Sequence, residues 1–340
     1  MAYQTQNRQI RRRKKHRFLM PFLGILNVSL WGSAAFLWFQ EVDVPPVVSV
    51  DFSQPVAILG DSVTNQPTVF DISQALTLEE VNLHIYSTHA LLVNLNTGEI
   101  IFNYRGDERA YPASVTKIMA VLVGLEHARS DELIVNADFD ELFNAGASMA
   151  NLVAGDIRSL SEILHASMLE SGADATSTLA YHVSDSYEAF VELMNETARH
   201  LGMHNTNFVN ASGLHDDNHY TTAYDTAILI EYALNNEHFR EVFTAPTYSF
   251  TNSDGNEQIM TSTMFSQITN NLFSPTFSNG EILGGKTGWT TPAGSCLASI
   301  ATDGVDEFAL ITFGAGEEVM APHIRDALAI YEYFFSLAGE

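Results

Sequence analysis

The sequence predicts an α+β fold, in which one antiparallel sheet takes strands from both ends of a domain and helices lie between them. Three observations support this class. Two β-hairpin patterns run from His89 to Tyr104 and from Gly294 to Gly314, and helical spacing dominates residues 114–234 between them. The two hairpins share a sheet only if the intervening helices cover one side of it.

The first 40 residues carry a targeting signal. Residues 1–17 contain seven Lys and Arg and no acidic residue, and residues 18–40 contain no charged side chain. About 20 apolar residues cross a bilayer as a helix, and a basic flank stays in the cytoplasm. The sequence therefore predicts a basic cytoplasmic tail at 1–17, a transmembrane signal anchor at 18–40 and an extracytoplasmic domain. A cleaved signal peptide is the alternative, and it would leave the domain secreted.

Residues 41–81 have no sustained period and contain four prolines among polar residues, which predicts an extracytoplasmic linker. The catalytic domain is expected at 82–340. Its expected strands are 89–95, 99–104, 248–252, 259–263, 294–301 and 307–314, and its expected helices are 114–127, several within 159–200, 222–234 and 324–337.

The charge balance of this exported part excludes one class of partner. From residue 41 onward, nine Lys and Arg face 41 Asp and Glu, so the basic footprint that nucleic acid requires is absent. Only two of those nine residues are lysines, Lys117 and Lys286. Each stands in a short motif, Ser-x-x-Lys or Lys-Thr-Gly, that serine acyl-transfer chemistry would use.

Ser114 and Lys117 are a candidate nucleophile and base. At this spacing on a helix the two side chains share one face. Ser114 falls in the first turn, where backbone N–H groups favour developing negative charge. A serine hydroxyl becomes a strong nucleophile when a base takes its proton, and a lysine whose pKa is lowered by burial can be that base. The alternative is an ordinary capped helix with a surface lysine. The catalytic interpretation of this pair therefore depends on whether other motifs of the same chemistry are present.

Lys286, Thr287 and Gly288 form such a partner motif. Lysine and threonine at a strand edge can bind a carboxylate, and a glycine allows a substrate backbone to pack close by. The backbone N–H groups of Trp289 and Ser114 are the candidate donors of an oxyanion hole. An ordinary hairpin turn is the alternative for this motif.

The two motifs belong to a longer pattern, which comprises segments 90–98, 107–119, 201–219, 285–288, 293–297 and 325–327. Together these segments resemble the serine D-alanyl-D-alanine carboxypeptidases, which are the low-molecular-mass penicillin-binding proteins. The likeness covers roughly residues 82–337.

The resemblance implies a penicillin-binding, serine β-lactamase-like fold, with an antiparallel sheet flanked by helices and an all-helical lobe. It implies removal of the terminal D-alanine from peptidoglycan stem peptides that end in D-Ala-D-Ala, through an acyl-enzyme at Ser114, and covalent capture by β-lactams. Lys117 would be the base, and Lys286 with Thr287 would hold the substrate carboxylate. No metal or other cofactor is implied, and the expected location is a bacterial cell membrane, with a single N-terminal span.

One motif departs from the family. Its Ser-x-Asn element reads Ser171-Gly172-Ala173 here, so Ser171 remains as a candidate proton shuttle between Lys117, Lys286 and the leaving amine, and the asparagine is absent. Loss of such a polar contact typically costs about 1–3 kcal/mol, which predicts slower but retained acylation. The departure also motivates an alternative function, a catalytically weak sensor or scaffold that binds wall peptides or β-lactams.

Two further alternatives rest on short patterns. Residues 231–235 read Glu-Tyr-Ala-Leu-Asn, which matches the Glu-x-x-Leu-Asn element of serine β-lactamases, although the pattern falls within a helical run. Residues 215–219 contain two histidines and two aspartates, which suggests a metallopeptidase, but the metal-binding His-Glu-x-x-His motif is absent. A helix end and a turn with a structural histidine are the simpler interpretations.

Overall fold

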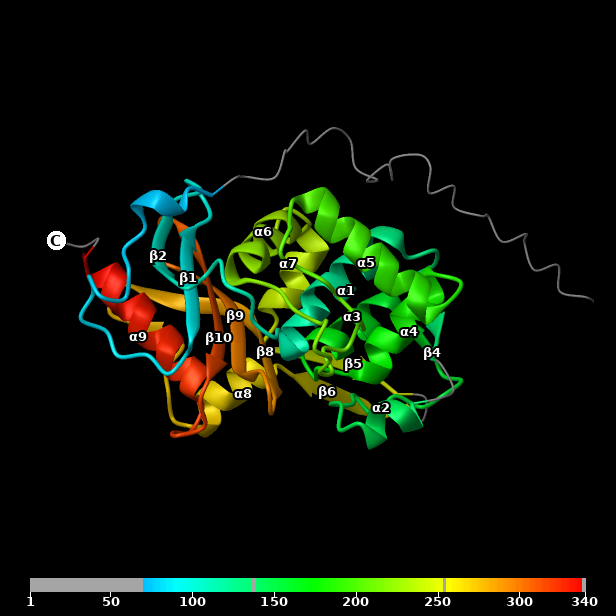
Figure 1. Cartoon of the computed structure of the whole chain (residues 1–340). Coiled ribbons are helices and arrows are strands. Elements are labelled where there is room, and N and C mark those ends of the chain that lie inside the picture. Colours follow the sequence, from blue (N-terminus) through cyan, green and yellow to red (C-terminus); the bar gives the residue numbers. More distant parts are fainter. Residues whose placement is uncertain (1–69, 136–138, 253–254, 338–340) are drawn as a thin grey trace, which may run out of the picture. The chain divides into compact units, whose positions relative to one another are not determined.

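A computed structural model describes residues 70–135, 139–252 and 255–337. Its main sheet has six antiparallel strands in the order β2-β1-β10-β9-β8-β7 (Figure 1). Strand β1 pairs with β10 from His89 opposite Phe313 to Asn94 opposite Phe308, so the two predicted hairpins do share one sheet. The strands are β1 His89–Asn94, β2 Ile100–Tyr104, β7 Thr276–Phe277, β8 Gly280–Thr290, β9 Gly294–Thr302 and β10 Glu307–Ala315.

The sheet separates two hydrophobic cores. On β1, Leu91 and Val93 point into the core shared with the helices on one side, whereas Ala90 and Leu92 point into the core on the other side. Successive side chains of a strand alternate between faces. Because both faces are buried, this strand reads as a continuous apolar run without a polar alternation.

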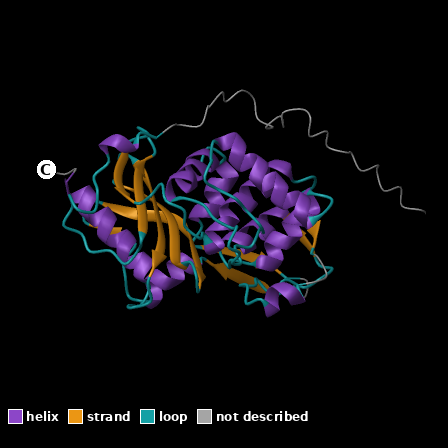
Figure 2. Cartoon of the chain, viewed as in Figure 1, coloured by secondary structure: helices purple, strands orange, loops and turns teal. Residues whose placement is uncertain are grey.

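One face of the sheet is covered by a largely helical lobe, visible as the cluster of purple helices in Figure 2. The predicted helices are present, and their polar caps define several of their starts: the side chain of Ser159 accepts from the backbone N–H of Glu162, in a capping box before α3. The α-helices of the lobe are α1 Lys117–His127, α2 Asp140–Asn144, α3 Leu160–Met168, α4 Ala173–Val183, α5 Tyr187–Leu201, α6 Ala223–Ala233 and α7 Glu237–Thr244.

The fold class predicted from the sequence is confirmed, with one refinement. The lobe is not composed of helices alone, because two short antiparallel pairs border it. One pair is β3 Glu132–Ile134 with β4 Ile157–Ser159, and the other is β5 Thr247–Thr251 with β6 Glu257–Thr261.

Two helices cover the opposite face of the sheet: α8 Thr263–Asn270 packs on β8, and α9 Pro322–Leu337 packs on β9 and β10. The buried carboxylate of Asp326 fixes α9 to the segment that enters β1. It accepts hydrogen bonds from the backbone N–H groups of Tyr86 and Ser87 and from the Ser87 hydroxyl. These bonds hold the first turns of α9 against the segment that leads into β1.

Residues 70–81 fall in the expected linker but lie against the sheet. The 3-10 helix η1, Ile72–Gln74, is followed by Leu76, whose N–H donates to Ile101 O at 3.0 Å and whose carbonyl accepts from Asn103 N–H at 2.9 Å. Phe70 and Val81 are buried. Isolated apolar residues in a polar, aperiodic stretch give no periodicity signal, so the sequence pattern did not reveal these contacts.

Within 70–135, 139–252 and 255–337, every helix is too short or too polar to span a bilayer. The tail at 1–17, the anchor at 18–40 and the linker up to residue 69 lie outside the described residues.

Candidate active site

Ser114 and Lys117 stand side by side at the junction of a 3-10 helix, η2 Ala113–Thr116, with α1. The Nζ of Lys117 lies 3.1 Å from Ser114 Oγ and also donates to the carbonyl of Ser212. The Lys117 side chain is fully buried, which lowers its pKa to about 7, although the charge of Asp174 opposes this shift. A base poised near neutrality therefore contacts the candidate nucleophile.

The helix predicted from Ser114 onward begins as a tighter 3-10 turn, and the first residue of this turn is strained. Ala113 has φ of 46°, in the left-handed region that residues with a Cβ atom rarely adopt. Such strain persists only where surrounding contacts hold it, and it is frequent at functional sites. Ala113 therefore needs support from the residues that pack around it.

Two glycines pack against this turn. A methyl group on Gly288 would lie 2.8 Å from the backbone nitrogen of Ser114, and one on Gly213, which has φ of +83°, would overlap the carbonyl of Ala113. The sequence suggested that Gly288 leaves room for substrate. In the structure the absent side chain leaves room for the nucleophile's own backbone.

Lys286 is the second buried lysine of the site. Its Nζ lies 3.0 Å from Ser171 Oγ and 2.7 Å from the carbonyl of Thr287. Burial and the nearby charge of Lys117 hold its pKa well below the usual range. Ser171 is itself buried and has φ of 58°. The structure thus joins Ser171 and Lys286, which are 115 residues apart in the sequence.

A cleft of about 350 Å³ opens beside Ser114. Ser171, Thr287, Gly288 and Trp289 also line it. The Thr287 hydroxyl is 2.8 Å from that of Thr263, and the half-exposed Trp289 donates through Nε1 to Glu317 at 2.8 Å. All seven residues named from the sequence therefore lie in or directly behind one cleft, with Lys117 and Lys286 buried behind it.

The loop after α5 supplies contacts that the residue-by-residue reasoning missed. Asn210 Oδ1 accepts from the backbone N–H groups of Ser212 and Gly213, and its Nδ2 donates to the carbonyl of Leu214. This turn aims the Ser212 carbonyl at Lys117. The sequence signal for this turn is the resemblance of segment 201–219 to the family, since no spacing of residues within it predicts these contacts.

His219 supports the strained turn through a chain of hydrogen bonds. Its Nδ1 accepts from Val209 N–H at 3.0 Å, so its proton lies on Nε2, which donates to Thr116 Oγ at 2.7 Å. The Thr116 hydroxyl in turn donates to the Ala113 carbonyl at 2.8 Å. Burial lowers the pKa of His219 to about 4, which keeps the ring neutral. Because both ring nitrogens are engaged, His219 is not free to bind a metal, and the metallopeptidase alternative loses one of its ligands.

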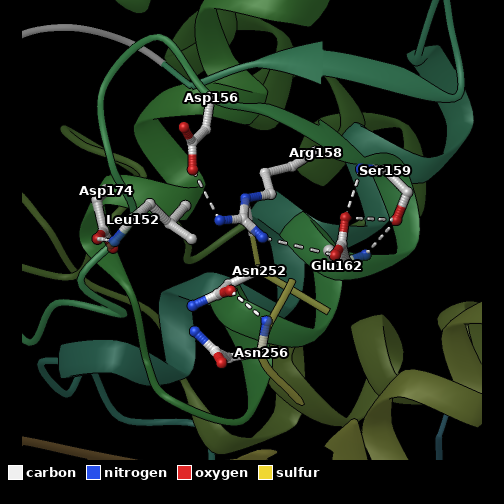
Figure 3. A network of polar contacts seen from close by, with 8 residues as sticks. All are labelled: Leu152, Asp156, Arg158, Ser159, Glu162, Asp174, Asn252 and Asn256. Atoms are coloured by element: carbon white, nitrogen blue, oxygen red, sulfur yellow. Dashed lines mark hydrogen bonds and ion pairs between the residues drawn. The ribbon is translucent and has the colours of Figure 1, made fainter. Parts of the chain in front are cut away.

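Asp174 anchors the loop that borders the cleft. Its fully buried carboxylate accepts from the backbone N–H groups of Ala150 and Leu152 at 2.9 and 3.0 Å, and the second bond is drawn in Figure 3. The same figure shows Arg158 bridging Asp156 and Glu162, which ties β4 to α3. The preceding residue, Ala173, is completely buried at the start of α4.

Comparison with known families decides the ancestry of this arrangement. The family model described as D-alanyl-D-alanine carboxypeptidase matches residues 75–317. The chain belongs to this family. The matched region contains the nucleophile turn, the Ser171 loop and the Lys286 strand, so the resemblance seen in the sequence is confirmed.

Individual relatives within the D-alanyl-D-alanine carboxypeptidase family agree. The chain is 32% identical over 230 residues to D-alanyl-D-alanine carboxypeptidase DacF of Bacillus subtilis, covering 66% of this chain and 57% of the relative. It is 29% identical over 267 residues to DacC of Escherichia coli, covering 73% and 60%, respectively. The match thus spans somewhat more than half the length of these two relatives. It spans 86% of the D-alanyl-D-alanine carboxypeptidase of Streptomyces sp. strain K15, at 29% identity and over 72% of this chain.

Solved structures of the family show the same fold. The Streptomyces K15 DD-transpeptidase superposes with a TM-score of 0.65 at 26% identity, covering 76% of this chain and 99% of that one. The D-alanyl-D-alanine carboxypeptidase of Mycobacterium tuberculosis H37Rv gives 0.64 at 20% identity, over 75% and 92% of the two chains, which bears on the fold alone.

The β-lactamase pattern at residues 231–235 has a structural explanation. Glu231 lies in the last turn of α6, a helix that packs on β1 and β10. It is not among the described residues that line the cleft beside Ser114. The pattern is therefore part of a helix end, as the simpler interpretation held.

Proposed function

We propose that this protein is a serine D-alanyl-D-alanine carboxypeptidase that removes the terminal D-alanine from peptidoglycan stem peptides. The observation that carries the proposal is the pair formed by Lys117 Nζ and Ser114 Oγ, 3.1 Å apart. A fully buried lysine with a pKa of about 7 is neutral in a large fraction of molecules at physiological pH and can accept the serine proton. Membership in the family supports the same reaction.

In the first step, Ser114 Oγ attacks the carbonyl carbon of the D-Ala-D-Ala peptide bond while its proton passes to Lys117 Nζ. The new C–O bond creates a tetrahedral oxyanion. We propose that the backbone N–H groups of Ser114 and Trp289 donate to this oxygen, which is where preorganised donors lower the barrier most. Gly288 supports this arrangement because it packs directly on the Ser114 nitrogen.

In the second step, the C–N bond breaks and the leaving nitrogen takes up a proton. Ser171, hydrogen-bonded to Lys286, is the proposed donor to this amine, and Lys286 or Lys117 resupplies its proton. Free D-alanine departs and leaves an ester on Ser114. A water molecule then attacks the ester carbonyl, a basic lysine accepts its proton, and the shortened peptide leaves with Ser114 restored.

β-Lactams are the proposed covalent inhibitors of this site. Their strained amide presents the same acceptor carbonyl to Ser114, but ring opening keeps the leaving amine attached to the acyl group. Because that amine stays in the cleft, water has poor access and the ester persists. Slow turnover of β-lactams is therefore expected, in contrast to a β-lactamase.

We further propose that residues 18–40 anchor the protein in a bacterial cell membrane, with residues 1–17 in the cytoplasm, residues 41–69 as the connection, and the catalytic domain outside. The uncharged stretch flanked by seven basic residues supports this arrangement. Resistance of the full chain to extraction from membranes by alkaline carbonate, together with an intact N-terminus, would test it. Release of a shortened chain into the medium would contradict it and favour the secreted form.

The experiment that tests the function combines covalent labelling with product release. The chain from Phe70 onward and its Ser114→Ala variant are incubated with a fluorescent penicillin, and separately with a pentapeptide that ends in D-Ala-D-Ala. We expect label and free D-alanine from the parent and neither from the variant. Labelling without any release of D-alanine would contradict the carboxypeptidase function and favour a sensor or scaffold that only binds. If a folded parent shows neither label nor release of D-alanine, Ser114 is not acylated and the proposal is wrong.

A further inference from the structure

A second cavity lies within the helical lobe. It has a volume of about 580 Å³, and no described residue lines both this cavity and the cleft beside Ser114. Its walls come from the end of α1 and the segment that follows, from the start of α3 and from α7, and these three helices pack against one another (Figure 1). Leu125, at the cavity, lies about 12 Å along α1 from Lys117. Pockets for small molecules typically measure about 300–1,000 Å³, so this cavity can hold a ligand of its own.

His165 brings an unpartnered acceptor atom to this cavity. The residue is 2% exposed, its ring stacks on Tyr248, and burial lowers its pKa, which favours the neutral ring. Nδ1 lies 2.8 Å from the carbonyl oxygen of Ser161, and because a carbonyl only accepts, the ring proton lies on Nδ1. Nε2 is then an acceptor, and it has no hydrogen-bond partner in the described part of the chain. It is not among the fully enclosed polar atoms either, so a ligand can reach it from the cavity that His165 lines.

Two carboxylates line the same cavity. Asp131, in the segment between α1 and β3, forms no ion pair with any described residue. Glu241 of α7 has only a distant partner among these residues, with 4.0 Å between its Oε2 and Nδ1 of His238. The charge of Glu241 is close enough to His165 to oppose the effect of burial on the pKa of that ring. The cavity therefore offers a ligand one buried nitrogen acceptor and two anionic side chains.

The rest of the wall favours a cation with an apolar body. Arg129 is the only Arg or Lys among the described residues of the wall, and its Nη1 lies 3.9 Å from Asp185, which is not part of the wall. From residue 41 onward, nine Lys and Arg face 41 Asp and Glu, so the field of the whole domain also attracts cations. The apolar part of the wall consists of Leu125, Ala128, Leu160, Leu164 and Val242. A matching ligand carries positively charged N–H donors on an apolar framework.

We propose that this cavity binds an organic ammonium ion, whose N–H groups donate to His165 Nε2 and whose charge is held by Asp131 and Glu241. The site is separate from the catalytic cleft and does not depend on the proposed carboxypeptidase function. Its place in the fold connects it to the catalytic groups, because α1 begins at Lys117, Ser171 follows α3, and α7 packs on β8. A bound ligand bridges these three helices.

The test uses benzylamine, which carries one ammonium group on an aromatic ring. Two compounds of similar size are compared with it: benzyl alcohol, which is neutral, and benzoate, which is an anion. Binding of each compound to the full chain is measured by isothermal titration calorimetry at neutral pH. We expect saturable binding of benzylamine, weaker binding of benzyl alcohol and no binding of benzoate. Added salt should weaken the binding of benzylamine, because it screens the two carboxylates.

Three variants locate the bound probe. His165→Phe keeps a ring that can stack on Tyr248 but removes the acceptor, and it should weaken the binding of benzylamine by about 10-fold or more, as expected for one hydrogen bond to a charged group. Glu241→Gln keeps the shape but removes the charge, and it should weaken that binding by about 2- to 5-fold without affecting benzyl alcohol. Glu237→Gln is the matched control, because Glu237 is exposed on the same helix but does not line the cavity. Glu241 is itself exposed, so its variant decides the matter if His165→Phe does not fold.

The outcomes separate this inference from the proposed function. If benzylamine does not bind saturably, or binds no more tightly than benzyl alcohol, the inference is wrong. Equal effects of Glu241→Gln and Glu237→Gln would also overturn it, because the attraction would then belong to the whole surface. Prior acylation of Ser114 by a penicillin should leave the affinity for benzylamine unchanged, whereas loss of binding would place the probe in the catalytic cleft and contradict the inference. If no acylation occurs, the proposed function fails, while the three variants still decide this site.

Discussion

Gly288 lies directly against the amide of Ser114, so closely that a methyl group at position 288 would come within 2.8 Å of the Ser114 nitrogen and within 3.1 Å of Ala113 Cβ. Strand β8 and the nucleophile turn therefore meet through a residue that lacks a side chain. This contact brings the N–H group of Ser114 beside strand β8, which also carries Trp289, the other proposed oxyanion donor.

Gly288→Ala should therefore impair acylation without unfolding the protein. The added methyl group pushes the Ser114 amide away from its position, and loss of one oxyanion donor typically costs about 100- to 1,000-fold in rate. The measurement is the second-order rate constant for labelling by a fluorescent penicillin, with circular dichroism as the check of folding. A folded variant that is labelled at the parental rate would show that the contact does not position the oxyanion hole.

The pH dependence of acylation should follow Lys117. The neutral amine is the proposed base, and burial lowers its pKa to about 7. Below that pH the amine is protonated and cannot accept the Ser114 proton, so the acylation rate should rise with pH and level off above a midpoint near 7. Rates measured between pH 5 and 9 with a neutral penicillin ester, which itself does not titrate there, provide the test. A midpoint near 10 would mean that Lys117 has the pKa of an exposed lysine and that the proposed base is wrong.

Asp174→Asn should move that midpoint to lower pH. The Asp174 charge stabilises protonated Lys117 and so raises its pKa against the effect of burial. Without this charge the pKa of Lys117 falls further, and the neutral base appears at a lower pH. Asp156→Asn is the matched control, because Asp156 is an acidic neighbour of Arg158 in the same region of Figure 3 but does not contribute to the pKa of Lys117. Equal shifts in both variants would contradict this specific electrostatic role.

Asp174→Asn should also reduce stability. The carboxylate accepts from the backbone N–H groups of Ala150 and Leu152, and an amide side chain has only one oxygen to offer them. A buried donor that loses its partner costs about 1–3 kcal/mol. Urea denaturation should show this decrease in the free energy of unfolding, and an unchanged midpoint would argue that the loop from 150 to 152 finds other partners.

Thr116→Val should destabilise the nucleophile turn, whereas Thr116→Ser should not. Valine has nearly the shape of threonine but cannot donate to the Ala113 carbonyl or accept from His219 Nε2, and both groups are buried. The expected loss is about 1–3 kcal/mol in the free energy of unfolding, with slower acylation because Ala113 at φ of 46° loses its support. Equal stability of the valine and serine variants would show that the hydroxyl is dispensable.

Ser114, Lys117 and Lys286 could be recognised from the sequence because their chemistry is local. The spacing of Ser-x-x-Lys places two groups on one face of a turn, and Lys117 and Lys286 are the only lysines from residue 41 onward. The environment that lowers the pKa of Lys117 is not local. It comes from burial of the side chain under segments that are distant in the sequence.

The order of helices and strands was likewise determined by the sequence, since periodicity reports which residues of each segment are buried. Tertiary structure alone decided which segments meet: the pairing of β1 with β10, the contact of Gly288 with Ser114, and the bond between Lys286 and Ser171. Each of these depends on the register of distant strands and on how helices pack over them. No short pattern encodes such a register, because many residues along both segments establish it together through burial.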